Sequence, residues 1–335
     1  MKNTTNSIAL LAALGLAAAG SAVHAEQLAI VVERDGVQTL ALVDTITPNQ
    51  AAIVAPISGL AKGEKLLGLD YRPLTRSLYA VGSSNRLYIV DRHSAVATPV
   101  SGLPFVTSLD GEHFGFDFNP TIDRIRNVSD ANQNLVLNPL NGALQLVATQ
   151  VFYTMGDPNF GMDPTVVHHA YDNNFVGAAT SQLYAIDAEL NVLVKQANNA
   201  GTLNTVGSLG VDFEPVGGFD ISGRSGVAWA ISTEGGTNSL GLSTLYQVDL
   251  STGATNWMGF IYTSEGEELS VTAMTVVPFR DCPCDYNHDG VVDGSDLGMM
   301  LSAWGTTDDL FDVNDDNLVD GADWGILGAT WGPCP

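Results

Sequence analysis

Short apolar runs broken by turn residues fill the first 280 residues of the chain. In SLYAVGSSNRLYIVD, two runs rich in Val, Ile, Leu and Tyr flank a Gly-Ser-Ser-Asn segment. Apolar runs on either side of turn residues are typical of β-hairpins. Helical periodicity is nearly absent from this region. The pattern therefore predicts an all-β domain built from short antiparallel strands.

Two motifs recur in step along the same region. Copies of the first motif, LALVD, LYIVD, NLVLN, LYAID and LYQVD, end at spacings of 47, 47, 49 and 62 residues. A second motif follows each copy, centred on Asp70, Asp117, Tyr171, Asp220 and Thr275. Repeats of this length, with several short strands each, are typical of propeller blades. We therefore predict a five-bladed β-propeller over residues 26–279, with six blades as the alternative if a longer unit contains an additional blade.

The two motifs also predict the strand order within a blade. We expect GFDFNP to form the innermost strand, LYAV the second, RLYIVD the third and a run such as ATPVSG the outermost. The domain begins with a second-strand sequence, LAIVVE, and ends with an inner-strand sequence, VTAMTVVP. Residues 271–278 should then complete the blade begun by residues 28–55, so that no strand edge is left unpaired where the ring closes.

Three segments of this domain resemble a known family. They are EKLLGLDYRPLTRSLYAVGSSNRLYIVD, GEHFGFDFNPTIDRIRNVSDANQNLVLNP and GTLNTVGSLGVDF. Together they are similar to the secreted bacterial family known as domain of unknown function 4394, over about residues 28–278. The resemblance implies a propeller-like fold in a family whose activity is uncharacterised. It supports the predicted fold and implies no particular chemistry.

The inner-strand motif places aspartates at equivalent positions of three units, Asp70, Asp117 and Asp220. Because side chains alternate along a strand, the Gly and Asp of each GxD sequence share one face. The three aspartates could then surround the central channel, with the glycines leaving room where the blades converge. Two interpretations stay open. The carboxylates either form a cation or polyol site in the channel, or cap turns and bond the backbones of the blades.

Signatures of common enzyme classes are absent from the sequence, including GxSxG, HExxH, the P-loop and the dinucleotide fingerprint. Glu112, His113 and Asp117 are near one another in sequence, but a glycosidase pair is diagnosed from the separation of its carboxylates in space. His168 and His169 should point to opposite faces of a strand, so they cannot both bind one metal ion. We expect a non-catalytic propeller that binds an unknown ligand, with a glycan as the candidate. The alternative is a glycan-directed hydrolase.

After Pro278 two similar segments appear, DYNHDGVVDGSDLGMMLSAWG and DVNDDNLVDGADWGILGATWG. Each begins with twelve residues that place oxygen ligands at positions 1, 3, 5, 7, 9 and 12, the pattern of a calcium loop. The ligands predicted for loop one are Asp285, Asn287, Asp289, the carbonyl of Val291, Asp293 and Asp296. Those predicted for loop two are Asp312, Asn314, Asp316, the carbonyl of Leu318, Asp320 and Asp323. We predict two bound Ca²⁺ ions, with Asn317 in the left-handed turn that Gly290 provides in loop one.

Each loop precedes a short stretch suited to a helix, with apolar residues at i, i+3, i+4 and i+7 that end at Trp304 and Trp331. A single EF-hand-like helix after each loop, and Asp rather than Glu at position twelve, resemble the dockerin family over residues 284–332. The resemblance implies that residues 280–335 are a non-catalytic module that folds around two calcium ions. It also implies a partner, a cohesin-like module or another scaffold or surface protein.

The three cysteines, Cys282, Cys284 and Cys334, flank this module. In an oxidising compartment Cys282 or Cys284 could pair with Cys334. Such a disulfide would close a loop of about 50 residues and stabilise the module by on the order of 4 kcal/mol in the chain-entropy model. The sequence leaves both pairings open. Zinc binding by the three thiolates is a less favoured alternative, because these soft ligands adjoin sites for a hard cation.

The first 25 residues combine a Lys near the start, an apolar run and small residues before Glu26. This pattern predicts a signal peptide cleaved near Ala25, and no later apolar run is long enough to span a membrane. The formal net charge is −24, and residues 281–335 contain twelve Asp with no Lys or Arg. Such a charge argues against nucleic acids and anionic membranes as partners. We therefore expect a secreted or cell-surface, extracytoplasmic protein.

Overall fold

A computed structural model describes residues 25–235, 241–278, 282–287, 291–314 and 316–333. The predicted signal peptide up to residue 24 lies outside the described residues, as do Asp289, Gly290 and Cys334. No helix in the described ranges is both long enough and apolar enough to cross a membrane.

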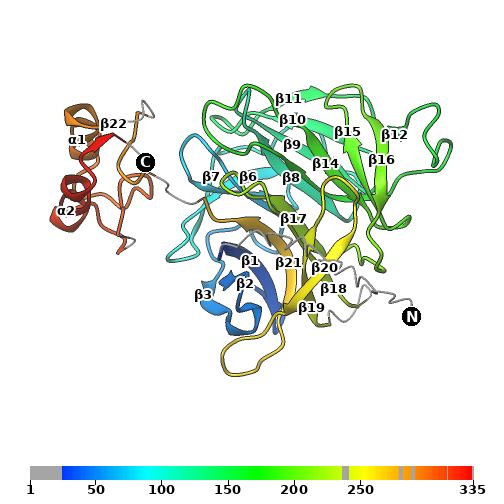
Figure 1. The fold of residues 1–335 in the computed structure, drawn as a ribbon, viewed down its shortest axis with the longest axis horizontal. Coiled ribbons are helices and arrows are strands. Elements are labelled where there is room, and N and C mark those ends of the chain that lie inside the picture. The colour runs from blue at the N-terminus through cyan, green and yellow to red at the C-terminus, as the bar shows by residue number, and fades with distance from the viewer. Residues whose placement is uncertain (1–24, 236–240, 279–281, 288–290, 315, 334–335) are drawn as a thin grey trace, which may run out of the picture.

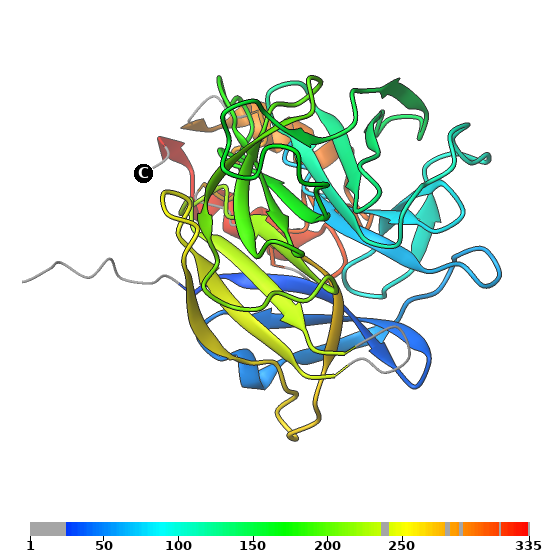
Figure 2. The same ribbon diagram turned by 90° about the vertical axis from the view of Figure 1, so that its right-hand side faces the viewer.

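Five sheets stand around a common centre (Figure 1, Figure 2). From the centre outward, blade I contains β21 (Ser270–Val276), β1 (Gln27–Arg34), β2 (Val37–Asp44) and β3 (Ala52–Pro56). Blade II contains β4 (Leu66–Tyr71), β5 (Leu78–Gly82), β6 (Arg86–Val90) and β7 (Ala97–Pro99). Blade III contains β8 (Phe114–Asn119), β9 (Arg124–Ser129), β10 (Asn134–Leu137) and β11 (Leu144–Val147).

Blade IV contains β13 (Val166–Tyr171), β14 (Leu183–Asp187), β15 (Val192–Gln196), β16 (Thr202–Ser208) and β12 (Phe152–Tyr153). Blade V contains β17 (Gly217–Ile221), β18 (Ala228–Thr233), β19 (Ser243–Val248) and β20 (Thr255–Phe260). A single 3₁₀ turn, η1 (Pro48–Gln50), follows β2. The five inner strands contact one another in the ring order β21, β4, β8, β13, β17 and back to β21.

The ring closes as the sequence predicts. The last propeller strand, β21, pairs antiparallel with β1, so blade I joins the two ends of the domain. The predicted order of strands from centre to rim also matches blades II and III. Part of the extra length before blade IV forms β12, a fifth strand that runs parallel to β16. The described residues therefore form five blades, and the six-bladed alternative is wrong.

Glycines allow the inner strands to approach closely. A Cβ atom on Gly68 would lie 2.5 Å from the Cβ of Phe116, and one on Gly115 would lie 2.3 Å from the Cδ2 of His169. Such distances are shorter than atoms tolerate, so a larger residue would force neighbouring blades apart. Buried apolar clusters between successive blades hold the rest of the ring, with Trp229 among the largest fully buried side chains.

The C-terminal residues form a separate small core beside the propeller (Figure 1). Helix α1 (Gly294–Ser302) and helix α2 (Gly321–Ala329) each follow one predicted loop, and β22 (Val291–Val292) pairs with β23 (Gly332–Pro333). Tyr286 packs against Phe311 at a ring distance of 4.7 Å. The helices confirm the predicted positions but not the predicted apolar face. Met300 and Leu327 are buried and Leu297 is partly buried, whereas four large side chains of the pattern are about half exposed, namely Leu301, Trp304, Trp324 and Trp331.

Candidate functional site

Three aspartates meet at the centre of the propeller. Asp70 on β4, Asp117 on β8 and Asp220 on β17 each place a carboxylate oxygen within 4.8 Å of the other two. All three are almost completely buried, with 1% to 2% of their surface exposed. Among the described residues of the chain they are the only such group of three potential metal ligands. The sequence-predicted aspartates therefore do share one centre.

Each carboxylate also joins its blade to the next. Asp70 Oδ2 accepts a hydrogen bond from the backbone N–H of Phe118 at 2.7 Å. Asp117 Oδ1 accepts one from Tyr171 at 3.2 Å, and Asp220 Oδ2 accepts one from Val276 at 2.6 Å. In each case the donor is one residue after the position in the next blade that is equivalent to the Asp itself. In blade IV that position is therefore Ala170 rather than the predicted Tyr171, because the motif is shifted by one residue.

Burial controls the protonation of the three carboxyls. Burial, followed by the charge of Asp220, raises the pKa of Asp70 well above its usual range. Burial and then the charges of Asp70 and Asp220 do the same to the pKa of Asp117. Burial raises the pKa of Asp220 to about 6. The cluster therefore favours shared protons, and three close oxygens of this kind also match the ligands of a small hard cation.

The channel at this centre is too narrow for a sugar. A cavity of about 20 Å³ is bounded by the inner strands, including Gly68, Gly115 and Gly218. This volume is enough for about one water molecule. A polyol could not reach the buried carboxylates without moving the blades apart.

A larger cavity opens at one mouth of the channel, where the inner strands β4, β8 and β17 begin. Its volume is about 490 Å³, within the range of small-molecule sites. Charged and polar residues from the strands of all five blades or the loops that lead into them contribute to its wall, namely Glu33, Gln38, Lys65, Glu112, His113, His168 and Glu214. Sequence reasoning singled out Glu112, His113 and His168 but missed the others, because they lie in different units and only the closed ring brings them together.

The two predicted calcium loops have the same internal hydrogen bonds. Asp296 Oδ1 accepts from the backbone N–H of Tyr286 at 2.7 Å, and Asp296 Oδ2 accepts from Asp293 at 2.9 Å. In loop two, Asp323 Oδ1 accepts from Val313 at 2.7 Å, and Asp323 Oδ2 accepts from Asp320 at 2.8 Å. Every residue in the second set lies 27 positions after its counterpart, as 323 − 296 = 27 shows. The internal repeat in sequence is therefore also a repeat in structure.

The ninth and twelfth positions of each loop also start the following helix. Asp293 caps α1 and Asp320 caps α2, and each forms a reciprocal capping box with the Asp three residues later. Asp296, Asp312 and Asp323 are completely buried, and residues 281–335 contain no Lys or Arg. Buried carboxylates in so acidic a segment fit a site that takes up a hard cation.

The other predicted ligands of loop two bond to residues of their own loop. Asp312 Oδ2 accepts from the backbone N–H of Asn317 at 2.7 Å, and Asn317 has the predicted left-handed backbone with φ of 70°. Asn314 donates from Nδ2 to Asp316 Oδ2 at 2.8 Å. No three carboxylates of the described loop residues place their oxygens within 4.8 Å of one another, as the three channel aspartates do. Calcium binding would require them to draw together.

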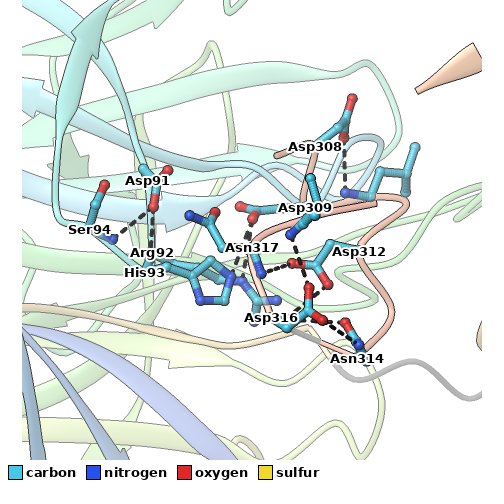
Figure 3. Close-up of polar contacts among 12 residues, drawn as sticks. Asp91, Arg92, His93, Ser94, Asp308, Asp309, Asp312, Asn314, Asp316 and Asn317 are labelled. Atoms are coloured by element: carbon cyan, nitrogen blue, oxygen red, sulfur yellow. Dashed lines mark hydrogen bonds and ion pairs between the residues drawn. The ribbon is translucent and has the colours of Figure 1, made fainter. Parts of the chain in front are cut away.

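One acidic residue of the C-terminal module contacts the propeller. Asp309 Oδ1 lies 3.7 Å from Arg92 Nε and 3.6 Å from His93 Nε2, between β6 and β7 of blade II. Figure 3 shows this contact next to Asp312 and Asp316 of loop two. The start of the second loop is thus close to the propeller.

The sequence of the propeller matches the model of a protein family over residues 39–273, and the family is described as a domain of unknown function, DUF4394. The chain belongs to this family. Comparison of the DUF4394 chain with curated proteins gives no match.

The DUF4394 chain is also similar to several solved structures. One is the crystal structure of a nidogen/laminin complex, with 10% identity, a TM-score of 0.40, and coverage of 76% of this chain and 98% of that one. A second is a protein of unknown function from Bacteroides thetaiotaomicron, with 13% identity, a TM-score of 0.46, and coverage of 75% and 64%. A third is an auxiliary nutrient binding protein from the same organism, with 13% identity, a TM-score of 0.36, and coverage of 57% and 53%. The DUF4394 chain thus spans less than two thirds of each Bacteroides protein.

Proposed function

We propose that this DUF4394 protein is an exported, non-catalytic binding protein with a ligand-binding propeller and a calcium-dependent, dockerin-like tether. The observation that carries the proposal is the matched pair of acidic loops, in which Asp296 and Asp323 are buried and make the same backbone hydrogen bonds. Two Ca²⁺ ions would draw the remaining loop oxygens around them. In so small a module, the free energy of metal binding would become free energy of folding.

The surface of the module supports a docking role. Leu301, Trp304, Trp324 and Trp331 expose about half of their surface although each is large and apolar. The surrounding residues 281–335 contain twelve Asp and no Lys or Arg. A partner with an apolar patch and a basic rim would match this surface. A cohesin-like module or another scaffold protein with these features is the proposed partner.

The propeller geometry supports binding rather than glycan hydrolysis. The three close carboxylates at the centre are inaccessible to a sugar, whereas the cavity at the channel mouth is open and of a suitable volume. A glycan is therefore a candidate ligand of the mouth and not of the three aspartates. Release of reducing sugar from any polysaccharide by the full chain would contradict the non-catalytic proposal.

The contacts of Glu26, the residue before β1, support export with cleavage after Ala25. Glu26 would become the first residue, and its buried carboxylate accepts hydrogen bonds from Trp229 Nε1 at 2.5 Å and from Ser225 Oγ at 2.9 Å. Mass spectrometry of the exported chain should therefore give the mass of residues 26–335.

A retention assay on the source organism's cell-envelope fraction tests the tether. We expect the full chain to be retained with calcium and released by a chelator. The double variant Trp304→Ala/Trp324→Ala should lose retention, because it removes apolar surface from the helices. The matched control is Trp257→Ala, which removes an exposed Trp from β20 of the propeller. Retention that is the same with calcium and with a chelator, or that is lost in Trp257→Ala instead, would contradict the proposed tether.

A further inference from the structure

The cavity at the channel mouth has an acidic wall. Three glutamates and one lysine line it, which gives a formal charge of −3 + 1 = −2. Lys65 Nζ lies 3.2 Å from the carboxylate of Glu33, so this pair largely neutralises itself. Among the described residues, neither Glu112 nor Glu214 forms an ion pair, and neither makes a side-chain hydrogen bond. The negative charge of the wall is therefore concentrated on these two residues.

An independent feature of the cavity is the imidazole of His168. His168 stands where blades II, III and V have Gly68, Gly115 and Gly218, so it is the one large side chain at this level of the inner strands. It lines both the mouth cavity and the small cavity below it. Only 7% of its surface is exposed. Its Nε2 is buried and has no hydrogen-bond partner.

The protonation of this imidazole can be inferred from its neighbours. Burial, and then the proximity of His113, lower the pKa of His168 to about 3, so the ring is neutral at physiological pH. The backbone of Pro215 hydrogen-bonds the ring, and a proline has no N–H, so its carbonyl accepts a proton held on Nδ1. Nε2 then carries a lone pair and can only accept. The mouth thus combines a buried acceptor, which needs a hydrogen-bond donor, with an acidic wall, which favours positive charge, and a cationic donor would match both.

We propose that the mouth cavity binds an organic cation, a ligand with a primary ammonium or guanidinium group. Its N–H groups would bond the carboxylates of Glu112 and Glu214 and, directly or through one water molecule, Nε2 of His168. A bound metal ion is a poorer fit, because these groups do not come together at metal-ligand spacing in the described part of the chain. The inference deepens the proposed binding function of the propeller and rests on it. An amino sugar would be both a glycan and an organic cation, so it would fit the proposed function and this inference.

Calorimetric titration of the calcium-saturated full chain with three cationic probes tests the inference. The probes are spermidine, agmatine and a glucosamine tetramer, and the N-acetylglucosamine tetramer serves as a neutral match for the last. We expect at least one cationic probe to bind, and its affinity to fall with added salt. Glu112→Gln and Glu214→Gln should each weaken binding about tenfold, because each removes one charge near the bound cation. Glu189→Gln is the matched control, since Glu189 is exposed and does not line the cavity.

The outcomes separate this inference from the broader proposal. Binding of no cationic probe, or equal binding to the Glu112→Gln, Glu214→Gln and Glu189→Gln variants, would overturn the cation site. Equal affinity for the neutral and the cationic tetramer would overturn it too, while leaving the propeller a glycan-binding domain. Loss of binding on addition of Zn²⁺, with Zn²⁺ itself bound through His168 and Glu214, would show a metal site instead.

Discussion

Asp70 and Asp220, from blades II and V, lie on either side of one hydroxyl group. Thr275 Oγ1 is 2.9 Å from Asp70 Oδ1 and 2.9 Å from Asp220 Oδ2. A hydroxyl has one proton to donate, so it can satisfy only one ionised carboxylate. The other contact needs a proton on the second carboxyl. The centre of the propeller therefore favours at least one protonated Asp in the folded chain.

This shared protonation predicts that the propeller loses stability as the pH rises. The pKa values of the three aspartates are raised in the folded protein. The stability that they contribute is therefore present at low pH and is lost as the pH rises through those folded pKa values. For Asp220 the loss runs from about pH 4 to about pH 6 and is on the order of 3 kcal/mol. The raised pKa values of Asp70 and Asp117 should extend this loss toward higher pH. We expect the melting temperature to fall as the pH rises through about 6 and beyond.

The variant Asp117→Asn should reduce this fall in melting temperature with rising pH, because it removes one charge from the cluster and keeps the shape of the side chain. Asp35→Asn is the matched control, since Asp35 is exposed in a turn whose positive φ suits Asn as well. A wild-type protein that instead becomes more stable at high pH, in a calcium-dependent way, would mean that the carboxylates are ionised around a cation.

Two histidines predict the opposite trend at low pH. Burial lowers the pKa of His168 and of His169 to about 3, whereas an unfolded histidine titrates near 6.5. Because the folded pKa of each histidine lies below the unfolded one, the stability that it contributes is present above pH 6.5 and is lost as the pH falls toward the folded pKa. Each histidine should remove up to about 1.4 kcal/mol of unfolding free energy per pH unit below 6.5. The variant His169→Gln should remove the contribution of one histidine, so in urea denaturation it should lose less stability than the wild type as the pH falls below 6.5, and an unchanged pH dependence would contradict the assignment.

The carboxylate of Glu26 should stabilise the closed ring. It accepts hydrogen bonds from the buried Trp229 and Ser222 and is 92% buried, so its removal leaves buried donors without partners. We expect Glu26→Ala to lower the free energy of unfolding by about 3 kcal/mol. Glu26→Gln keeps an acceptor in the same place and should cost less. Urea denaturation of both variants measures the difference, and equal losses would argue against a role for these hydrogen bonds.

Much of the propeller could be predicted from its repeats, because each motif occupies the same place in every blade. The strand order, the pairing of β1 with β21 and the convergence of Asp70 with Asp220 all follow from that regularity. The mouth cavity could not be predicted in the same way. Glu33 lies near the end of β1 and Glu214 in the loop before β17, and their proximity depends on loop paths that carry no periodic signal.

The C-terminal module shows a second limit of periodicity. An i, i+3, i+4, i+7 pattern predicts one apolar face, and Met300 and Leu327 lie on the buried side as expected. The core is too small to cover the rest of that face, so Trp304 and Trp331 remain exposed. The pattern therefore located the helices correctly but could not tell a core contact from a surface available to a partner.

The cysteines of the module should form one disulfide, between Cys282 and Cys334. Cys284 is a buried thiol, and β22 pairs with β23, which ends one residue before Cys334. Peptide mapping without reduction should recover a Cys282–Cys334 crosslink that survives Cys284→Ser. Cys282→Ser should destabilise the module by about 4 kcal/mol in the chain-entropy model. A crosslink from Cys284 would contradict this pairing.

The most direct test of the central claim is a calorimetric titration of calcium into the chelator-stripped full chain. We expect two Ca²⁺ ions per chain, one fewer in Asp296→Asn, one fewer in Asp323→Asn, and two in the control Asp308→Asn, whose exposed side chain lies between the loops. Absence of calcium binding, or a stoichiometry that neither Asp296→Asn nor Asp323→Asn changes, would contradict the calcium-dependent tether.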